Sequence, residues 1–342
     1  MFKYFGIFIS ISIWMMLVGC DENQQSKKQA NETEYKTIKT DSIEILTQFI
    51  KKDSTDYSLF LHRAVLFVNE GKVDPALRDL MQALELNPND PQIYLLLSDI
   101  YFLLEKPHNS IEALQKALKI DPENETAFLK LAEIYLLKAE YRRAQQYAES
   151  AIRLNSENAE AYYLKGISRL EIGDTTDALN MLKISARLDT LNYMTLMQIA
   201  GIHGAKNDTN AEVYYIKALE IRPNDERTLY LLGMYYQNHN KFEQALNTYK
   251  TLSDNYPQHV SAYYNSGYIY LVELEDYESA VQFFEQAIEI DGAFVQAVYN
   301  LGRTYEAMGL YNKARFQYKK SLELLPNYPL AVQGLNRLDE ME

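Results

Sequence analysis

The sequence predicts an all-α protein, an α-solenoid built from about eight consecutive helix-turn-helix repeats. The main observation is a period close to 34 residues, at which small, large apolar and helix-stopping residues recur along the chain. A period of this length is typical of helical repeat arrays. The second observation is an ordinary globular composition, with 47% hydrophobic and 24% charged residues. The 342 residues would otherwise allow two or three compact domains, but a solenoid extends a single core instead.

The first 19 residues are expected to be a targeting segment and not part of the fold. Lys3 gives a short positive start, and residues 5–18 are apolar apart from small and hydroxyl side chains. This stretch is too short to span a bilayer comfortably. It ends in Leu17-Val18-Gly19-Cys20, which resembles a bacterial lipobox, and Cys20 is the only cysteine. The resemblance implies cleavage before Cys20 and acylation of its thiol, because several acyl chains together anchor stably. The alternative is an ordinary secretory signal with a chance cysteine.

Residues 20–40 are expected to form a flexible, acylated tether, because they are polar and cannot bury enough apolar surface to fold. Asp21 and Glu22 follow the cysteine directly. In some bacterial lineages acidic residues here direct a lipoprotein to the cell surface, and in others an aspartate retains it in the inner membrane. Residues 41–56 place apolar side chains at helical spacing between Ile43 and Ile50. We expect this segment to form an N-terminal capping helix over the first repeat.

Eight repeats account for residues 57–328 of the sequence. Their expected ranges are 57–90, 91–124, 125–158, 159–192, 193–225, 226–259, 260–294 and 295–328. Small residues at the eighth position let two helix backbones approach closely, and a proline or a similar residue stops the second helix of most repeats. Each repeat is therefore expected to be two helices joined by a tight turn. The eighth-position residues are Ala64, Ser98, Ala132, Gly166, Ala200, Gly233, Gly267 and Gly302.

This order of small, aromatic and helix-stopping positions resembles the tetratricopeptide repeat. The resemblance covers residues 57–328 and implies a right-handed superhelix of paired helices. Repeat 5 is one residue shorter than 34 and repeat 7 is one residue longer. We place both changes in the turn inside the repeat, where a solenoid tolerates them. Residues 329–342 are expected to form a C-terminal capping helix that covers the last repeat, with Ala331, Leu335 and Leu338 as its apolar residues.

The sequence contains no motif for catalysis or for a cofactor. The glycine-rich phosphate-binding motifs, the zinc-protease motif and the nucleophile-elbow motif are absent. The five histidines are scattered over different repeats without the spacing of metal ligands. We therefore expect no enzymatic activity, no metal, no cofactor and no small-molecule substrate. The formal net charge of −13 repels phosphate backbones, so nucleic acid is not expected as a partner.

The positions that the repeat pattern leaves free are the candidates for binding. In the family that the chain resembles, the first helices line a concave groove, and the fifth and ninth residues of each repeat face it. Here these positions are rich in Tyr, Leu and Met, which resembles a peptide-binding surface. Asparagines occupy the sixth position of two consecutive repeats, where some relatives use them to hold peptide backbone. The candidate groove residues are Leu95, Leu129, Tyr163, Met197, Tyr230, Met234, Tyr264, Asn265, Tyr268, Tyr299, Asn300 and Arg303. The alternative is a tightly wound superhelix that buries these side chains against its own neighbours.

Repeat 5 departs most from the others. Gly201 and Gly204 lie where the groove face is expected, close to Met194 and Met197. A glycine inside a helix costs about 1 kcal/mol relative to alanine. We interpret the pair as a hinge or a local pocket, and simple drift within a weak repeat is an equally good interpretation.

The sequence therefore predicts a lipid-anchored, non-catalytic scaffold or adaptor that binds protein or peptide ligands in a bacterial envelope assembly. We expect it to face the periplasm or the cell surface, with the outer membrane as the preferred site of its anchor. Two alternatives stay open. One is a periplasmic holdase or assembly factor for extended clients, and the other is a regulatory subunit of a cell-wall enzyme.

Overall fold

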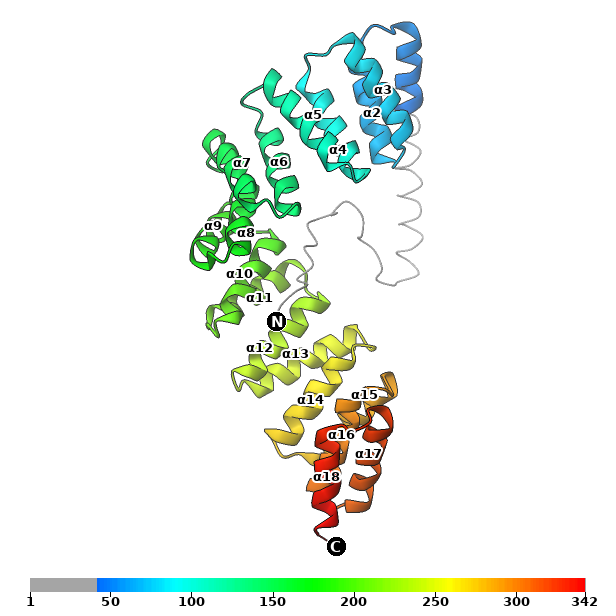
Figure 1. Cartoon of the computed structure of the whole chain (residues 1–342), viewed down its shortest axis with the longest axis vertical. Helices are drawn as coiled ribbons and strands as arrows, with labels where there is room; N and C mark the ends of the chain where they lie inside the picture. Colours follow the sequence, from blue (N-terminus) through cyan, green and yellow to red (C-terminus); the bar gives the residue numbers. More distant parts are fainter. Residues whose placement is uncertain (1–41, 342) are drawn as a thin grey trace. The chain divides into compact units, whose positions relative to one another are not determined.

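The computed structural model describes residues 42–341, and within that range the chain folds into helices and tight turns with no strand. The predicted all-α solenoid of paired helices is confirmed (Figure 1). The predicted targeting segment, the lipidation site at Cys20 and the tether lie outside the described residues. The chain divides into an N-terminal body that ends at Leu188 and a C-terminal body that begins at Asp189.

Within residues 42–188, the N-terminal body contains a helix over residues 42–52 and four helix pairs. Each first helix packs on its own second helix, and that second helix packs on the next first helix. The pairs are α2 (Tyr57–Asn69) with α3 (Val73–Leu86), α4 (Pro91–Leu103) with α5 (Pro107–Ile120), α6 (Glu125–Leu137) with α7 (Tyr141–Leu154), and α8 (Ala159–Glu171) with α9 (Thr175–Leu188).

The C-terminal body repeats this arrangement and adds a final helix, α18 (Pro329–Asp339). Its second helices again connect successive first helices by packing on both. The pairs are α10 (Tyr193–Ala205) with α11 (Asn210–Ile221), α12 (Glu226–Asn238) with α13 (Phe242–Asn255), α14 (Val260–Val272) with α15 (Tyr277–Ile290), and α16 (Val295–Ala307) with α17 (Tyr311–Leu324).

Side chains just before the first helices fix where those helices begin. A carboxylate or amide oxygen, or in α14 the Nδ1 atom of a histidine, accepts a hydrogen bond from a backbone N–H in the first turn. This bond satisfies a donor that the helix itself leaves unpaired. Asp90 accepts from the Gln92 amide at 2.9 Å, and Asn158 accepts from the Ala161 amide at 2.8 Å. The capping residues of α2, α4, α6, α8, α10, α12 and α14 are Asp56, Asp90, Asn124, Asn158, Asn192, Asp225 and His259.

The core of each repeat forms where a small residue of the first helix faces a large residue of the second. In the C-terminal body the large residue is aromatic: Tyr249, Phe284 and Tyr318 are fully buried. Each of these rings lies against a glycine of its own first helix. A Cβ atom on Gly233 would lie 2.5 Å from the Tyr249 ring. The ring therefore leaves room only for glycine at this position.

The turn inside each repeat places one residue in the left-handed region of backbone conformation. Gly71 and Gly309 occupy this position with φ of 70° and 72°, which glycine adopts without strain. Glu105 and Ala139 adopt the same conformation with φ of 55° and 57°, at a cost of about 1 kcal/mol each. In repeat 5 the length change extends beyond the turn, because α11 has 12 residues where the other second helices have 14.

Both ends of the array are covered by additional helices. The Arg63 guanidinium donates to Thr47 Oγ1 of the helix over residues 42–52 at 2.8 Å, and it donates twice to the carboxylate of Asp79 at 2.7 Å. At the other end, α18 packs on α16 and α17 and buries Ala331 and Leu338. In the described part of the chain, no helix has the length and apolar character needed to cross a membrane.

Candidate functional site

The candidate residues all lie on the first helices of the repeats, on what we call the first-helix face. Each body has its own part of this face: the fifth, sixth and ninth residues of α2, α4, α6 and α8 in the N-terminal body, and those of α10, α12, α14 and α16 in the C-terminal body. None of the candidates is fully exposed. Leu95, Met197, Tyr299 and Asn300 are buried. Leu129, Tyr163, Tyr230, Met234, Tyr264, Asn265, Tyr268 and Arg303 are half-buried.

Tyrosine rings of the first-helix face in the C-terminal body pack partly on one another and partly on the core. The Tyr264 ring lies 4.9 Å from Phe294 and 6.0 Å from Phe284, measured between ring centroids. The Tyr230 ring lies 5.3 Å from His259, which caps the first helix of the next repeat, α14. Ring contacts within each repeat therefore hold the tyrosines in position, while their outer edges stay accessible to a partner.

The two asparagines of the sixth position have partners inside the protein. Asn265 donates from Nδ2 to the Tyr249 hydroxyl at 3.2 Å. Asn300 is only 4% exposed and donates to the Tyr264 hydroxyl at 3.1 Å. The Asn300 side-chain oxygen accepts from Arg303 at 3.2 Å. The structure thus gives both amides a role in joining helices, which the sequence pattern did not indicate.

In repeat 5, one glycine has free space around its Cα atom, whereas nearby residues are closely packed. A Cβ atom on Gly201 would meet no atom within 4 Å, whereas one on Gly204 would lie 3.4 Å from the Tyr215 hydroxyl. Met197 is buried, and its sulfur accepts a hydrogen bond from Thr228 at 3.2 Å. A hinge at repeat 5 stays a prediction.

Acidic side chains mark the first-helix face of the N-terminal body. Lys130 pairs with Asp99 at 2.5 Å, and no basic side chain among the described residues pairs with Glu133 or Glu160. Burial raises the pKa of Glu133, and the charge of Glu160 raises it further. Burial also raises the pKa of Glu160. Glu133, the ninth residue of α6, is therefore held partly desolvated on this face, and the charge of Lys130 offsets only part of the rise in its pKa and in that of Glu160 on α8.

We expect Glu133→Gln to stabilise the folded chain by about 1 kcal/mol at pH 7. The folded-state pKa of Glu133 is raised, so folding favours the protonated carboxyl group. The penalty of ionising it is absent below the unfolded-state pKa and is complete once the pH exceeds the folded-state pKa. Urea unfolding of the variant and the parent should therefore differ at pH 7 and agree near pH 4. Glu123→Gln, at an exposed position, is the control; an equal gain there would contradict the burial argument.

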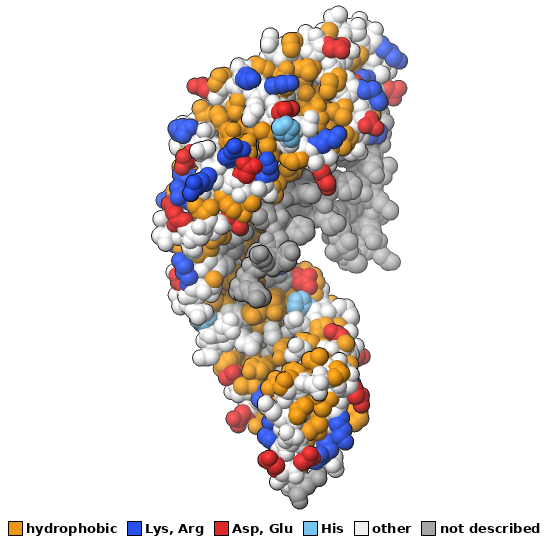
Figure 2. Space-filling view, in the orientation of Figure 1, with side chains coloured by type: hydrophobic (Ala, Val, Ile, Leu, Met, Phe, Trp, Pro, Cys, Tyr) orange, Lys and Arg blue, Asp and Glu red, His pale blue; other side chains and the backbone are white. Residues whose placement is uncertain are grey.

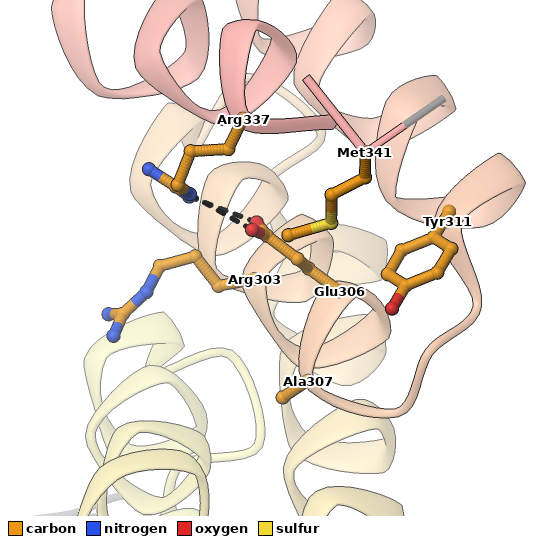
Figure 3. Close-up of a pocket in the computed structure, with 6 residues that line it drawn as sticks. All are labelled: Arg303, Glu306, Ala307, Tyr311, Arg337 and Met341. Atoms are coloured by element: carbon orange, nitrogen blue, oxygen red, sulfur yellow. Dashed lines mark hydrogen bonds and ion pairs between the residues drawn. The ribbon is translucent and has the colours of Figure 1, made fainter. Parts of the chain in front are cut away.

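The C-terminal body also contains a cavity of about 340 Å³ between α16, the start of α17 and the end of α18. Figure 3 shows Glu306 at its centre and the Arg303 and Arg337 side chains extending toward one side. Arg337 donates from Nε and Nη2 to the two carboxylate oxygens of Glu306, both at 2.9 Å. Of the lining residues, only Arg303 was a candidate from the sequence. Arg337 could have been found as well, because it lies 34 residues after Arg303. The cavity is lined by Arg303, Glu306, Ala307, Tyr311, Arg337 and Met341.

Charged residues elsewhere on the surface are mixed in sign. Figure 2 shows acidic and basic side chains interspersed with apolar ones over the visible face. Among the described residues, no group of three or more histidine, cysteine, aspartate or glutamate side chains is placed to hold a metal ion.

Family models of helical repeats match most of the repeat array. The TPR domain of cytochrome c-type biogenesis protein H matches residues 76–192. Three further tetratricopeptide repeat models match residues 57–90, 230–294 and 271–338. The chain belongs to the tetratricopeptide repeat family. Repeats of this family form scaffolds for protein–protein interaction, and the fold therefore supports a protein or peptide partner.

Solved structures of tetratricopeptide repeat proteins share this fold. The C-terminal part of a TPR repeat-containing protein from Cytophaga hutchinsonii has a TM-score of 0.62 and 20% sequence identity, over 70% of this chain and 98% of that one. PilF of Pseudomonas aeruginosa has a TM-score of 0.54 and 18% identity, over 60% of this chain and 94% of that one. At these identities the likeness is one of fold.

Among curated proteins, the human protein O-mannosyl-transferase TMTC3 is 28% identical over 149 residues. The match covers 44% of this chain and 16% of the length of the human protein. It therefore concerns a small part of that protein.

Proposed function

We propose that this tetratricopeptide repeat protein is a non-catalytic scaffold or adaptor that binds an extended segment of a partner protein along its first-helix face. We further propose that it works in a bacterial envelope, held by lipid on Cys20, with the outer membrane as the preferred location. The fold supports the binding class, and the sequence of residues 1–40 supports the anchor.

The observation that carries the binding proposal is a set of half-buried tyrosines with unused hydroxyl groups. Among residues 42–341, the hydroxyls of Tyr163, Tyr230 and Tyr268 have no hydrogen-bond partner, and burial raises the pKa of Tyr163 to about 12. Rigid aromatic rings with a free polar atom contribute strongly to protein interfaces. In either body, a peptide on this face would cover the rings and give their hydroxyls hydrogen-bond partners in place of water.

Photo-crosslinking in cells tests the proposed binding face. A benzoylphenylalanine in place of Met234 on α12 is expected to capture one predominant protein in stoichiometric yield. The same residue in place of Phe316, which is 64% exposed on the second helix α17, serves as the control and should capture much less. Equal capture at both positions, or none at Met234, would contradict the proposal. A broad set of weak products at Met234 would favour a holdase instead.

The proposed anchor is tested separately by fractionation. Cys20→Ala removes the only thiol, so no thioether-linked lipid can form. We expect the variant to leave the membrane fraction. In cell extracts, a crosslinker at Met234 of the variant should still capture the same partner as in the parent. A variant that stays with the membranes would show that Cys20 is not the anchor.

A further inference from the structure

The turn between α4 and α5 exposes three consecutive large apolar side chains. Phe102, Leu103 and Leu104 are 40%, 58% and 37% exposed. They begin a stretch, residues 102–109, in which every residue is exposed. The fold does not require apolar residues here, because the same three positions of repeat 1 hold Val68-Asn69-Glu70. A run of exposed apolar residues on a folded domain marks a surface that a partner covers.

The turn of the next repeat extends this apolar surface. Leu137 occupies in repeat 3 the position of Leu103, and it is 40% exposed. Helix α5 packs on both α4 and α6, so the turns of repeats 2 and 3 follow one another along one edge of the N-terminal body. Packed helices lie about 8–10 Å apart, which makes the two turns close neighbours. We call four residues the apolar turn patch: Phe102, Leu103, Leu104 and Leu137.

Basic residues border the apolar turn patch in a chain that is acidic overall. Residues 102–109 and 137–143 contain four basic and two acidic residues, which gives two net positive charges with His108 neutral. The whole chain has a formal net charge of −13. The corresponding turns of repeats 1 and 4, residues 68–75 and 170–177, contain more acidic than basic residues. The positive excess is therefore confined to the part of the edge that carries the apolar side chains.

Two of these four cations have no ion-pair partner among the described residues. Lys138 and Arg143 both pair with Glu140. Lys106 and Arg142 are exposed and make no ion pair within residues 42–341. An exposed ammonium and an exposed guanidinium beside apolar side chains match the surface of an anionic bilayer, where lipid phosphates lie just outside the acyl region.

We propose that the apolar turn patch of the N-terminal body lies on an anionic lipid bilayer. Its Phe and Leu side chains enter the boundary between headgroups and acyl chains, and Lys106 and Arg142 bind lipid phosphates. The projecting turn can insert between lipid molecules without a preformed groove, which a protein partner would have to supply.

This contact rests on the proposed function, because the anchor at Cys20 would bring the patch to the bilayer. Even fully extended, residues 21–41 span at most about 75 Å, so an anchored chain holds the N-terminal body close to the lipid. The resulting effective concentration lets a weak contact persist. The first-helix face would stay open to a peptide, because it lies along the sides of the first helices and the patch lies at their ends.

Fluorescence quenching by labelled lipid tests the contact. The mature chain, residues 20–342, carries Cys20→Ala and an N-terminal histidine tag that binds a nickel-chelating lipid, so attachment does not depend on acylation. The vesicles contain phosphatidylglycerol and phosphatidylcholine at about 1:3, which supplies the anionic surface. Leu103→Cys then provides the only thiol for an environment-sensitive dye. Phosphatidylcholine with a nitroxide on its acyl chain quenches a dye that enters the bilayer.

We expect the nitroxide lipid to quench the dye at position 103 strongly and the dye of Met81→Cys little. Met81 is the matched control position, because it is 43% exposed on the second helix α3 of the same body. Combining Lys106→Gln with Arg142→Gln should weaken insertion of the turn about tenfold. Quenching at position 103 should then fall toward that at position 81.

A second pair of substitutions controls for the general loss of positive charge. Lys119→Gln with Arg153→Gln removes two exposed basic residues from the last turns of α5 and α7. These residues lie at the opposite ends of the same two helices from the patch. We expect quenching at position 103 to stay within about twofold of the parent. Circular dichroism of each variant checks that the helices are intact.

The outcomes separate the lipid contact from the proposed anchor. Equal quenching at positions 103 and 81, or equal quenching in the two double variants, would overturn the contact. The proposed function would still stand, because the nickel-chelating lipid and not Cys20 attaches the chain in this experiment. If cell fractionation rejected Cys20 as the anchor, strong quenching at position 103 would still support the patch as a lipid-binding surface.

Discussion

Replacing Gly233 with alanine is expected to destabilise the C-terminal body by about 3 kcal/mol. The new Cβ atom would lie 2.5 Å from the ring of Tyr249. That ring is fully buried and cannot move outward. Its hydroxyl donates to Gln237 at 3.0 Å and accepts from Asn265 at 3.2 Å, so a shifted ring also loses hydrogen bonds. Chemical unfolding and hydrogen exchange over residues 226–259 would measure the loss.

Gly201→Ala is the matched control for this substitution. It makes the same change inside a first helix, but the new Cβ atom would meet no atom within 4 Å. We expect a gain of about 1 kcal/mol, because alanine favours the helix more than glycine does. A second variant that combines Gly233→Ala with Tyr249→Leu should recover part of the loss, since the corresponding residues of repeat 1 are Ala64 and Leu80, both fully buried. Equal effects of the two glycine substitutions would show that the facing ring does not decide the cost.

These glycines show how far the sequence alone could predict the fold. The eighth-position column was visible because small residues repeat at a fixed interval. The reason for glycine in particular required the structure, because the ring that excludes a Cβ belongs to the other helix of the repeat. Tyr249, Phe284 and Tyr318 face glycine, and so does the smaller Leu182, whose side chain would lie 2.9 Å from a Cβ atom on Gly166. Repeat 5 has alanine at the eighth position although its second helix carries Tyr215. Periodicity thus predicts the helices, and the pairing of side-chain volumes needs coordinates.

The candidate site was predicted less completely than the fold, for a physical reason. A side chain of the first-helix face can either pack on the next repeat or remain available to a partner, and its spacing is the same in both cases. Asn300 illustrates the first case, because it is buried and bonded to Tyr264. Arg303 illustrates the second, and its neighbour Arg337 was overlooked because the C-terminal helix was assigned only a capping role.

Replacing Asp79 with asparagine is expected to destabilise the N-terminal body by about 2 to 3 kcal/mol. Asp79 and Arg63 are largely buried, with 8% and 15% of their side-chain surfaces exposed. The substitution leaves the guanidinium of Arg63 partly desolvated without its carboxylate. Arg63 also donates to Thr47, so we expect the helix over residues 42–52 to exchange its amide hydrogens faster. Chemical unfolding gives the first effect, and hydrogen exchange with mass spectrometry gives the second.

Asp254→Asn provides the comparison, because it removes the carboxylate of an ion pair that is exposed. Asp254 pairs with Lys250 at 2.7 Å, but 61% and 72% of the two side chains are exposed. Solvent screens such a pair, and its loss should cost less than about 0.5 kcal/mol. If Asp79→Asn lowered the free energy of unfolding by equally little, water would have to supply hydrogen-bond partners for the Arg63 guanidinium. The hydrogen bond from Arg63 to Thr47 would then not depend on Asp79. A different outcome would be a large loss of global stability while residues 42–52 exchange their amide hydrogens as in the parent. Asp79 would then stabilise the pairing of α2 with α3 but not the helix over residues 42–52.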